Sequence, residues 1–533
     1  MKKNNIYTFI GLTALLLITN LAKAEIISVD DSLTINVNNN TFWWSGIIEH
    51  GSKMPLAKPY QADFRNNCYT NQVQPLLLSS TGEVIWSEQP FVINFEPGKL
   101  NVHAKSVVFQ YNKPGKTLKE AYQFASKTYF PPSGEMPDPL LFTNPQYNTW
   151  IELLYNQNQK DILKYARSIL TNGLPAGVLM IDDNWQEDYG NWNFHPSRFP
   201  NPKQMIDSLH TMGFKVMLWI CPFVSPDSYI FRDLKEKKYL VTDDNSYPSL
   251  IKWWNGSSAE LDLTNPAANN WFKTQLDRLT NEFGVDGFKL DAGDFEFYVN
   301  VHSFKPNATP TDHCEAWGKI GLNYPLNEYR AMWKMGGQPL GERLHDKNHG
   351  FEDLQLLVPD MLVEGLMGYY FSCPDMIGGG DNTAFTKHAD LDQESIVRSA
   401  QCHALMPMMQ FSVAPWRVLD KQNLKAVKIA VAIREKFKNS ILELVKKTAK
   451  TGEPIIKPLE YDYPNKGYAT IVDEFLLGDN ILVAPVLVKG ATTRSIIIPE
   501  GKWKSFNRQI FKGPKKIEMK VTLNDLPYFE KIK

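Results

Sequence analysis

The sequence predicts an α/β protein, a (β/α)8 TIM barrel with an N-terminal β-sandwich and a C-terminal β-sandwich. Apolar strand-like runs alternate with amphipathic helical patterns over residues 136–440, which is typical of parallel strands joined by helices. Residues 25–135 and 441–533 instead carry short alternating runs separated by Gly, Pro, Asn and Ser, a pattern typical of antiparallel sheets. An open doubly wound sheet is the alternative for the central part. It is disfavoured because no Gly-rich phosphate loop follows any predicted strand.

The first 24 residues have the pattern of a secretory signal peptide. Two lysines precede an apolar stretch over residues 10–21, and residues 22–24 form a small-x-small cleavage site. A membrane helix is the alternative, but the apolar stretch is short for a span of the bilayer. We therefore expect a mature chain that begins near Glu25, has no membrane span and is secreted or periplasmic.

The composition disfavours nucleic acid as a partner and hints at a carbohydrate. Among 533 residues, 57 Lys and Arg nearly balance 58 Asp and Glu, so there is no basic surplus. Aromatic residues make up 12% and include 14 Trp. Aromatic faces stack on sugar rings, although most Trp side chains serve packing. The five Cys include no pair at zinc spacing, and we expect buried thiols.

The strands of the barrel are predicted from short apolar runs, and its helices from apolar residues at helical spacing. Candidate strands are Thr149–Leu153, Gly177–Ile181, Lys215–Cys221, Gly287–Leu290, Pro339–Arg343, Gly368–Cys373 and Met409–Val413. Predicted helices before the second, third and fourth of these are Asp161–Leu170, Lys203–Met212 and Asn269–Phe283. Candidate strands outside the barrel are Ile27–Val29, Leu33–Val37, Val107–Tyr111, Tyr468–Val472, Ile481–Val488 and Arg494–Ile498.

Acidic side chains follow four of the predicted barrel strands. In such a barrel the carboxyl ends of the strands meet at one rim, where the functional site lies. The second strand ends in Asp182 and Asp183, the fourth in Asp291, the fifth is followed by Asp346, and the sixth by Asp375. One acid at a strand end is often only a helix N-cap. Several converging acids suit a ligand with many hydroxyl groups, because carboxylates accept hydrogen bonds from them.

Glycoside hydrolysis requires two carboxyl groups with different roles. One must be ionised to attack the anomeric carbon. Lys289 lies two residues before Asp291, so both face the same side of a strand, and the ammonium is expected to lower the pKa of Asp291. The second carboxyl must carry a proton. Neither His345 nor Lys347, on either side of Asp346, is a residue that obviously raises the pKa of its carboxyl.

A divalent metal is the alternative explanation for the acid cluster. Asp182, Asp183 and Asp291 have the ligand type that Mg²⁺ or Ca²⁺ takes, but no phosphate-binding element or EF-hand loop accompanies them. We therefore predict neither a metal nor another cofactor. A Ser-His-Asp triad has no support, because the chain lacks a GxSxG motif.

Several segments resemble glycoside hydrolase family 31, and the resemblance covers most of residues 140–510. GFKLDAGD at 287–294 resembles the family's nucleophile strand, in which a Lys precedes the catalytic Asp by two positions. HDKNHGFEDLQLLVPDML at 345–362 resembles the acid/base segment, in which an aromatic residue, here Phe351, stands five positions after the catalytic Asp. GYYFSCPDMIGGG at 368–380 resembles the strand whose Asp binds the sugar. Residues 454–464 and 475–503 resemble the barrel exit and the first C-terminal sandwich.

The resemblance implies a retaining exo-α-glycoside hydrolase that acts on terminal α-linked sugars of an oligosaccharide or glycoside, most like the family's α-galactosidases. It assigns Asp291 as nucleophile and Asp346 as acid/base. The expected substrate-binding residues are Asp182, Asp183, Trp185, Trp219, Lys289, Arg343 and Asp375, with core packing as the alternative for the two Trp side chains. An α-glucosidase, a transglycosylase and an inactive sugar-binding homologue stay open. The chain departs from the pattern at Asp294, where Glu is usual, and at His345, where Gly is usual.

Overall fold

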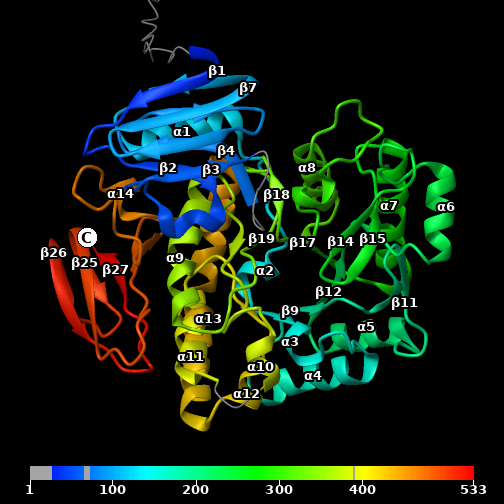
Figure 1. Ribbon diagram of the computed structural model, residues 1–533. Coiled ribbons are helices and arrows are strands. Elements are labelled where there is room, and N and C mark those ends of the chain that lie inside the picture. The colour runs from blue at the N-terminus through cyan, green and yellow to red at the C-terminus, as the bar shows by residue number, and fades with distance from the viewer. Residues whose placement is uncertain (1–26, 65–71, 388–390, 533) are drawn as a thin grey trace, which may run out of the picture.

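The computed structural model describes residues 27–64, 72–387 and 391–532 (Figure 1). The described residues form an N-terminal sheet, a central barrel and a C-terminal sheet. In Figure 1 the N-terminal sheet lies above the helices α9 (Phe351–Leu366), α11 (Gln393–Ala404) and α13 (Lys421–Thr451), and the C-terminal sheet lies to their left. A segment inserted into the barrel lies on the right. The expected signal peptide and Cys68 lie outside the described residues. Among the helices that are described, none has the length and apolar character needed to cross a membrane.

Eight strands form the N-terminal sheet, in the order β18-β4-β5-β7-β6-β3, with β1 paired to β7 and β2 to β4. The strands are β1 (Ile27–Asn36), β2 (Trp43–Ile47), β3 (Tyr60–Asp63), β4 (Gln72–Ser79), β5 (Val84–Trp86), β6 (Val92–Glu96), β7 (Lys99–Asn112) and β18 (Met332–Trp333). The last of these comes from the barrel region and pairs in parallel with β4.

The N-terminal region also contains a helix, although the sequence pattern up to about residue 130 predicts strands alone. This helix, α1 (Leu118–Tyr129), begins after Thr117, whose side chain accepts a hydrogen bond from the backbone amide of Glu120. Its buried residues, among them Leu118, Ala121, Tyr122 and Ala125, recur at helical spacing and pack on the sheet.

Eight parallel strands form the barrel sheet, in the order β20-β19-β17-β16-β12-β9-β8-β21. They are β8 (Gln146–Asn148), β9 (Val178–Ile181), β12 (Lys215–Ile220), β16 (Gly287–Leu290), β17 (Leu326–Tyr329), β19 (Glu342–Arg343), β20 (Ser372–Cys373) and β21 (Gln410–Phe411). A parallel bridge between Met376 and Gln410 joins the two ends of the sheet. The predicted fold class is confirmed: a nearly closed parallel barrel with sheet-rich domains at both ends of the chain.

Two barrel strands differ from the prediction. The first is β8, whereas the expected strand Thr149–Leu153 contains the helical turn α3 (Trp150–Leu153). The prediction lacks β17, so β19 and β20 are the sixth and seventh strands. Side chains of the unpredicted strands are polar and pair within the barrel, where Gln410 Nε2 donates to Gln146 Oε1 (3.2 Å) and Glu328 Oε2 (2.5 Å). Such strands lack the apolar pattern from which the others were predicted.

Helices surround the barrel as expected. Those within or beside it are α2 (Leu140–Thr143), α4 (Gln159–Thr171), α5 (Pro202–Thr211), α6 (Tyr229–Lys237), α7 (Pro266–Arg278), α8 (Pro310–Ile320), α9 (Phe351–Leu366), α10 (Thr383–Lys387), α11 (Gln393–Ala404), α12 (Pro415–Val418) and α13 (Lys421–Thr451). Between β12 and β16 the chain inserts a three-stranded antiparallel sheet of β13 (Phe223–Val224), β14 (Leu250–Trp253) and β15 (Gly256–Glu260). The expected domain boundary at 440/441 falls inside α13.

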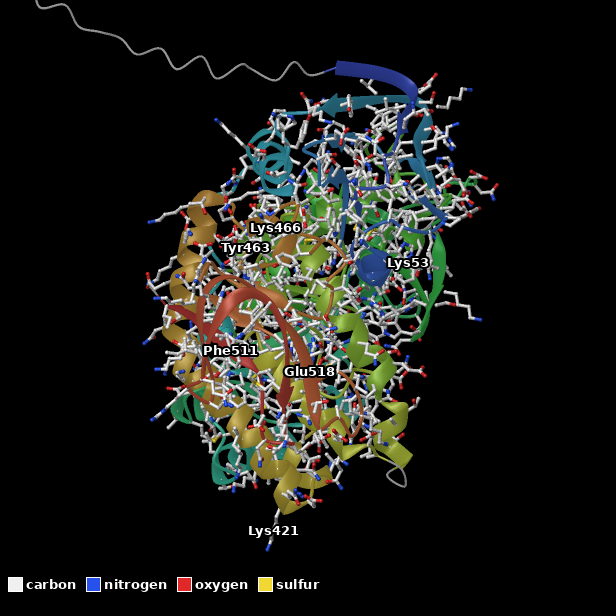
Figure 2. The ribbon with its side chains drawn as sticks, turned by 90° about the vertical axis from the view of Figure 1, so that its left-hand side faces the viewer. Lys53, Lys421, Tyr463, Lys466, Phe511 and Glu518 are labelled. Atoms are coloured by element: carbon white, nitrogen blue, oxygen red, sulfur yellow. The ribbon has the colours of Figure 1, made fainter. Side chains whose placement is uncertain are left out.

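Six strands form the C-terminal sheet, in the order β22-β23-β24-β27-β25-β26. They are β22 (Ile456–Lys457), β23 (Phe475–Leu477), β24 (Ile481–Val483), β25 (Thr493–Ser505), β26 (Ile510–Lys520) and β27 (Tyr528–Ile532). Figure 2 shows this sheet in front of the barrel helices, with Phe511 and Glu518 on β26 and Lys421 at the far end of α13. The expected strand Tyr468–Val472 forms turns and loop instead. Leu476, Leu482 and Phe529 belong to a small separate core in this domain.

Candidate active site

A cavity of about 330 Å³ opens at the carboxyl ends of the barrel strands, within the range of volumes typical of small-ligand sites. It holds five acids and three cations, together with aromatic side chains. The lining residues are Trp150, Tyr155, Asp182, Asp183, Trp219, Trp254, Lys289, Asp291, Arg330, Arg343, Asp346, Gly380, Asp381 and Asn382. Both carboxyl groups predicted to be catalytic therefore line the same cavity.

Asp291 follows β16 directly and has close polar partners on both carboxylate oxygens. Trp219 Nε1, from β12, donates to Oδ2 over 2.8 Å, and Arg330 Nε lies 3.2 Å from Oδ1. Burial disfavours the charged form, but Arg330 first and Lys289 next outweigh it, and the pKa of Asp291 lies well below its usual range. The lysine two residues before Asp291 thus acts in the predicted direction, and a second cation acts more strongly. Asp291 is ionised at working pH, as a nucleophile must be.

Asp346 stands three residues after Arg343, in the loop that follows β19. Its Oδ1 accepts a hydrogen bond from Arg343 Nη1 over 2.8 Å, and 44% of its side chain is exposed toward the cavity. Withdrawal from bulk water favours its neutral form, but Arg343 and Lys289 outweigh this and lower the pKa of Asp346. Its neighbour His345 adds no positive charge, because burial and Lys347 lower the pKa of this imidazole to about 3.

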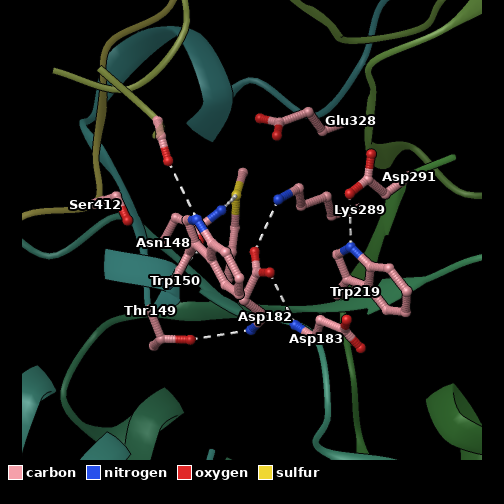
Figure 3. Close-up of polar contacts among 12 residues, drawn as sticks. Asn148, Thr149, Trp150, Asp182, Asp183, Trp219, Lys289, Asp291, Glu328 and Ser412 are labelled. Atoms are coloured by element: carbon pink, nitrogen blue, oxygen red, sulfur yellow. Dashed lines mark hydrogen bonds and ion pairs between the residues drawn. The ribbon is translucent and has the colours of Figure 1, made fainter. Parts of the chain in front are cut away.

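The two acids that end β9 have different environments (Figure 3). Asp182 Oδ2 accepts from Lys289 Nζ over 2.8 Å, an ion pair in which both side chains are buried. Asp183 Oδ2 accepts from Tyr189 Oη over 3.1 Å and from Asn255 Nδ2 over 2.5 Å, the latter coming from the inserted sheet. Burial, and then the charge of Asp182, raise the pKa of Asp183 to about 7. The two side chains therefore differ: Asp182 is held in an ion pair with Lys289, whereas the raised pKa of Asp183 lies near neutral pH.

Two predicted sugar-binding residues lie behind the cavity wall. Asp375 is fully buried and accepts hydrogen bonds from Arg343 Nη1 and from the backbone amide of Lys347, both over 2.8 Å. Trp185 is fully buried, donates to the carbonyl of Trp219 over 2.8 Å and packs against Trp192. Neither side chain lines the cavity, so Asp375 orients Arg343, and Trp185 supports the strand that carries Trp219.

Several cavity residues were missed by the sequence reasoning. Arg330 follows the unpredicted strand β17, and its Nη2 is also paired with Asp294. The pKa of Asp294 is raised to about 6 by burial, although Arg330 opposes the shift. The guanidinium of Arg330 lies over the ring of Trp254, 4.9 Å from its centroid. Trp150, in the turn mistaken for a strand, donates from Nε1 to the carbonyl of Gly380 over 3.2 Å.

The part of the chain that the structure describes contains no group of side chains that could bind a metal ion. Within it, no three or more His, Cys, Asp or Glu side chains are grouped so that they could hold an ion. Three of the cavity acids, Asp182, Asp291 and Asp346, are paired instead with Lys289, Arg330 and Arg343, respectively.

The barrel carries two carboxyl groups in one cavity at the carboxyl ends of its strands, and comparison with known proteins places the chain in a family. Two family models match: "Glycosyl hydrolases family 31 TIM-barrel domain" over residues 141–438, and "Glycosyl hydrolase family 31 C-terminal domain" over residues 452–532. The chain belongs to glycosyl hydrolase family 31.

Individual relatives agree with this assignment. The chain is 32% identical over 428 residues to the myogenesis-regulating glycosidase of Mus musculus, covering 78% of this chain and 60% of the relative. It is 24% identical over 495 residues to alpha-xylosidase XylQ of Lactiplantibacillus pentosus, covering 83% and 60%. The chain thus spans about 60% of the length of these two curated relatives. The structure of a Flavobacterium johnsoniae GH31 dextranase complexed with glucose shares the fold, with a TM-score of 0.85 at 20% identity, covering 95% of this chain and 67% of the dextranase.

Proposed function

We propose that the protein is a retaining, exo-acting α-glycoside hydrolase, in which Asp291 attacks the anomeric carbon and Asp346 serves as acid/base. The observation that carries the proposal is the placement of both carboxyl groups in one cavity with unequal surroundings. Each carboxyl group contacts a guanidinium, but the Asp291 side chain is only 13% exposed, whereas 44% of the Asp346 side chain is exposed toward the substrate space. Retaining glycosidases need this division between a nucleophile and a group that first donates and then accepts a proton.

An α-galactoside is the substrate class that we propose. Asp182 and Asp183 stand side by side on the cavity wall, and adjacent carboxyl groups can accept hydrogen bonds from two hydroxyls on one side of a sugar. The axial O4 of galactose lies on the same side of the ring as O6, whereas the O4 of glucose is equatorial. An α-glucosidase, a transglycosylase acting through the same residues, and a sugar-binding protein without activity are the competing functions.

Initial rates on p-nitrophenyl α-glycosides of galactose, glucose and xylose separate these functions. We expect the galactoside to have the highest kcat/KM. Asp183→Asn should reduce that value by 10-fold or more, and Asp188→Asn, an exposed acid on β10 (Gln186–Asp188), should leave it unchanged. A higher kcat/KM for the glucoside would refute the galactoside preference, and turnover of none of the three would favour the sugar-binding protein. Product analysis with added acceptor sugar distinguishes hydrolysis from transfer.

The nucleophile can be identified directly. In a 2-deoxy-2-fluoro glycosyl fluoride the 2-fluorine slows both formation and breakdown of the intermediate, and the reactive leaving group restores the rate of formation, so the covalent glycosyl-enzyme accumulates. Peptide mass spectrometry should then find the sugar on Asp291. A label on another carboxyl group would contradict the proposed mechanism.

We also propose that residues 1–24 are a signal peptide and that the mature protein is secreted or periplasmic. Support comes from the charged start, the short apolar stretch and the small residues at 22 and 24. N-terminal sequencing of the protein from its native source should begin near Glu25. A mature protein that retains Met1 would refute this.

A further inference from the structure

Lys347, the residue after Asp346, has its side chain buried behind the active-site cavity. Its Nζ donates to Asp360 Oδ2, on α9, over 2.7 Å. The two side chains are only 3% and 1% exposed, and neither lines the cavity. An ion pair therefore anchors the loop that carries Asp346 to a helix behind it, through the residue next to the proposed acid/base.

The backbone of Lys347 is held as closely as its side chain. Its amide donates to Asp375 Oδ2 over 2.8 Å, and its carbonyl accepts from the amides of Gly380 and Asp381 over 3.0 and 3.1 Å. A Cβ on Gly380 would lie 2.7 Å from the carboxyl carbon of Asp346, so this segment runs directly beside the carboxyl group. Lys347 is thus a point where the Asp346 loop, the segment after β20 and α9 are joined.

The helix that holds the ion pair is itself fixed against the N-terminal domain. The 3-10 helix η1 (Ile48–Lys53) packs on α9, and a Cβ on its Gly51 would lie 2.4 Å from the Cα of Asp360. Only a glycine allows this approach. Lys53, at the end of η1, is labelled in Figure 2. The anchor of the Asp346 loop is therefore connected to a domain whose described residues contribute no side chain to the cavity wall.

The charges around the Lys347–Asp360 ion pair indicate a role beyond stabilising the fold. Burial raises the pKa of Asp360 to about 6, although Lys347 opposes the shift. One turn further along α9, burial and then the charge of Asp360 hold the pKa of Glu364 well above its usual range. A buried ion pair often stabilises a fold no better than apolar residues of similar size, because both charges lose their hydration. The ion pair does, however, fix the position of the loop that carries Asp346 and Lys347 relative to α9.

We propose that Lys347 and Asp360 are a positioning pair, which holds the carboxyl group of Asp346 where it can protonate the departing oxygen. This inference rests on the proposed role of Asp346. General acid catalysis requires hydrogen-bond reach to the proton acceptor, so a loop displaced by a fraction of an ångström loses proton transfer before it loses substrate binding. Asp291, which is carried by another strand, is left in place.

The test is the dependence of kcat/KM on the pKa of the leaving group, which reports the glycosylation step. It is measured on a series of aryl and alkyl α-glycosides for the full chain and for Lys347→Met, Asp360→Asn and Asp346→Ala. We expect both pair variants to lose 10-fold or more on poor leaving groups and less than about 3-fold on dinitrophenyl glycosides, because activated groups leave without a proton. Their slopes should be steeper than that of the unmodified protein, in the direction of Asp346→Ala.

A smaller fraction of folded protein would not change the leaving-group slope, because it lowers the rates on all substrates by the same factor. Lys457→Met is the matched control, since Lys457 is 1% exposed and paired with Asp462 and Asp479, and none of the three lines the cavity. It should destabilise the chain and leave the slope unchanged. Asp360→Asn keeps the shape of the side chain and a hydrogen-bond acceptor, so it tests the proposal if Lys347→Met does not fold.

The double variant Lys347→Met with Asp360→Leu separates positioning from stability. An apolar pair should recover thermal stability, as such replacements of buried ion pairs can do. A slope steeper than that of the unmodified protein in this stable double variant supports the proposal, whereas a slope equal to that of the unmodified protein would overturn it. Unmodified slopes in both single variants would also overturn it. If Asp346→Ala itself leaves the slope unchanged, the acid/base assignment fails, which is a different result from failure of the pair variants alone.

Discussion

Arg330 is the cation in closest contact with the proposed nucleophile, and its removal should change the pH dependence of the reaction. Its Nε lies 3.2 Å from Asp291 Oδ1, and its Nη2 is paired with Asp294. Arg330→Met keeps most of the length and apolar stem of the side chain and removes the charge. We expect the pKa of Asp291 to rise, because the strongest opposing interaction to its burial is lost.

The size of the shift follows from the distance between the charges. At 3.2 Å and an effective dielectric constant of about 20, two unit charges attract by about 5 kcal/mol, which is an upper limit because water enters the space that the guanidinium leaves. Neighbouring opposite charges lower carboxyl pKa values by about 1–3 units in proteins, and each unit corresponds to about 1.4 kcal/mol. Lys289 and the hydrogen bond from Trp219 remain in the variant. An increase of about 1–2 units is therefore expected.

The sign of the effect is fixed by the role of Asp291. A nucleophile must be ionised, so a depressed pKa keeps the enzyme active at acid pH, and a raised pKa makes activity fall at a higher pH. The acid limb of kcat/KM, which reports the free enzyme, should move upward by about 1–2 pH units in Arg330→Met. Arg330→Lys keeps a positive charge and should move the limb by less than about half a unit.

The assay is the initial rate on an activated aryl α-glycoside from pH 8 down to about pH 2, with circular dichroism at each pH to verify that the variants stay folded. An activated leaving group is used because it reduces the dependence on Asp346. An acid limb in Arg330→Met that coincides with that of the unmodified protein, or that lies at lower pH, would refute the electrostatic reasoning.

Three further predictions concern the same site. Asp346→Ala should hydrolyse unactivated glycosides very slowly but react with activated ones, and azide should then yield an α-glycosyl azide; Asp291→Ala should be nearly inert toward all of them. Product analysis by NMR checks this, and near-native rates of Asp346→Ala on disaccharides would exclude it as acid/base. Trp219→Phe should reduce kcat/KM by roughly 10- to 100-fold, because a hydrogen bond to a charged group contributes about 1.5–3 kcal/mol; an unchanged value would show that this bond does not matter for attack. Activity should survive dialysis against EDTA, and a loss that Ca²⁺ or Mg²⁺ restores would favour the metal alternative.

The hydrophobic pattern of the sequence predicted the apolar barrel strands β9, β12 and β16. It missed β8 and β17, which carry polar side chains. The strands β9, β12 and β16 are buried runs of Val, Leu, Ile, Met and Phe, and the sequence places them within one residue of their observed ends. β8 and β17 contribute Gln146 and Glu328 to a hydrogen-bonded group inside the barrel with Gln410. Such a group is stable only because its partners come from three separate strands, and this information is not present in any one segment of the sequence.

The residues of the candidate site were likewise predicted only in part. Acids at strand ends were sufficient to find Asp182, Asp183, Asp291 and Asp346, because the carboxyl ends of parallel strands share one rim. The strand-end position does not determine the direction of a side chain, so Asp375 was assigned to the sugar, although it contacts Arg343 behind the wall. Arg330 and Trp150 were missed because one follows a strand that was not predicted and the other lies in a helical turn that was predicted as a strand.

The charges around Asp346 explain how one carboxyl group can serve as acid and then as base. Arg343 and Lys289 keep its pKa low, while burial and the charge of Asp291 act in the opposite direction. A sugar that fills the cavity removes the water around the exposed side chain, which penalises the ionised form and favours uptake of a proton.

Formation of the glycosyl-enzyme in the proposed reaction lowers the pKa of Asp346 again. When Asp291 forms the glycosyl ester, its negative charge is lost, and with it one of the interactions that raise the pKa of Asp346. Arg343, Lys289 and Arg330 still lower the pKa of Asp346, and desolvation still opposes them. The pKa of Asp346 falls, and the group returns to the carboxylate that must accept a proton from the incoming water. In the proposed reaction, formation of the covalent bond at Asp291 therefore itself converts Asp346 from acid to base, without movement of either strand.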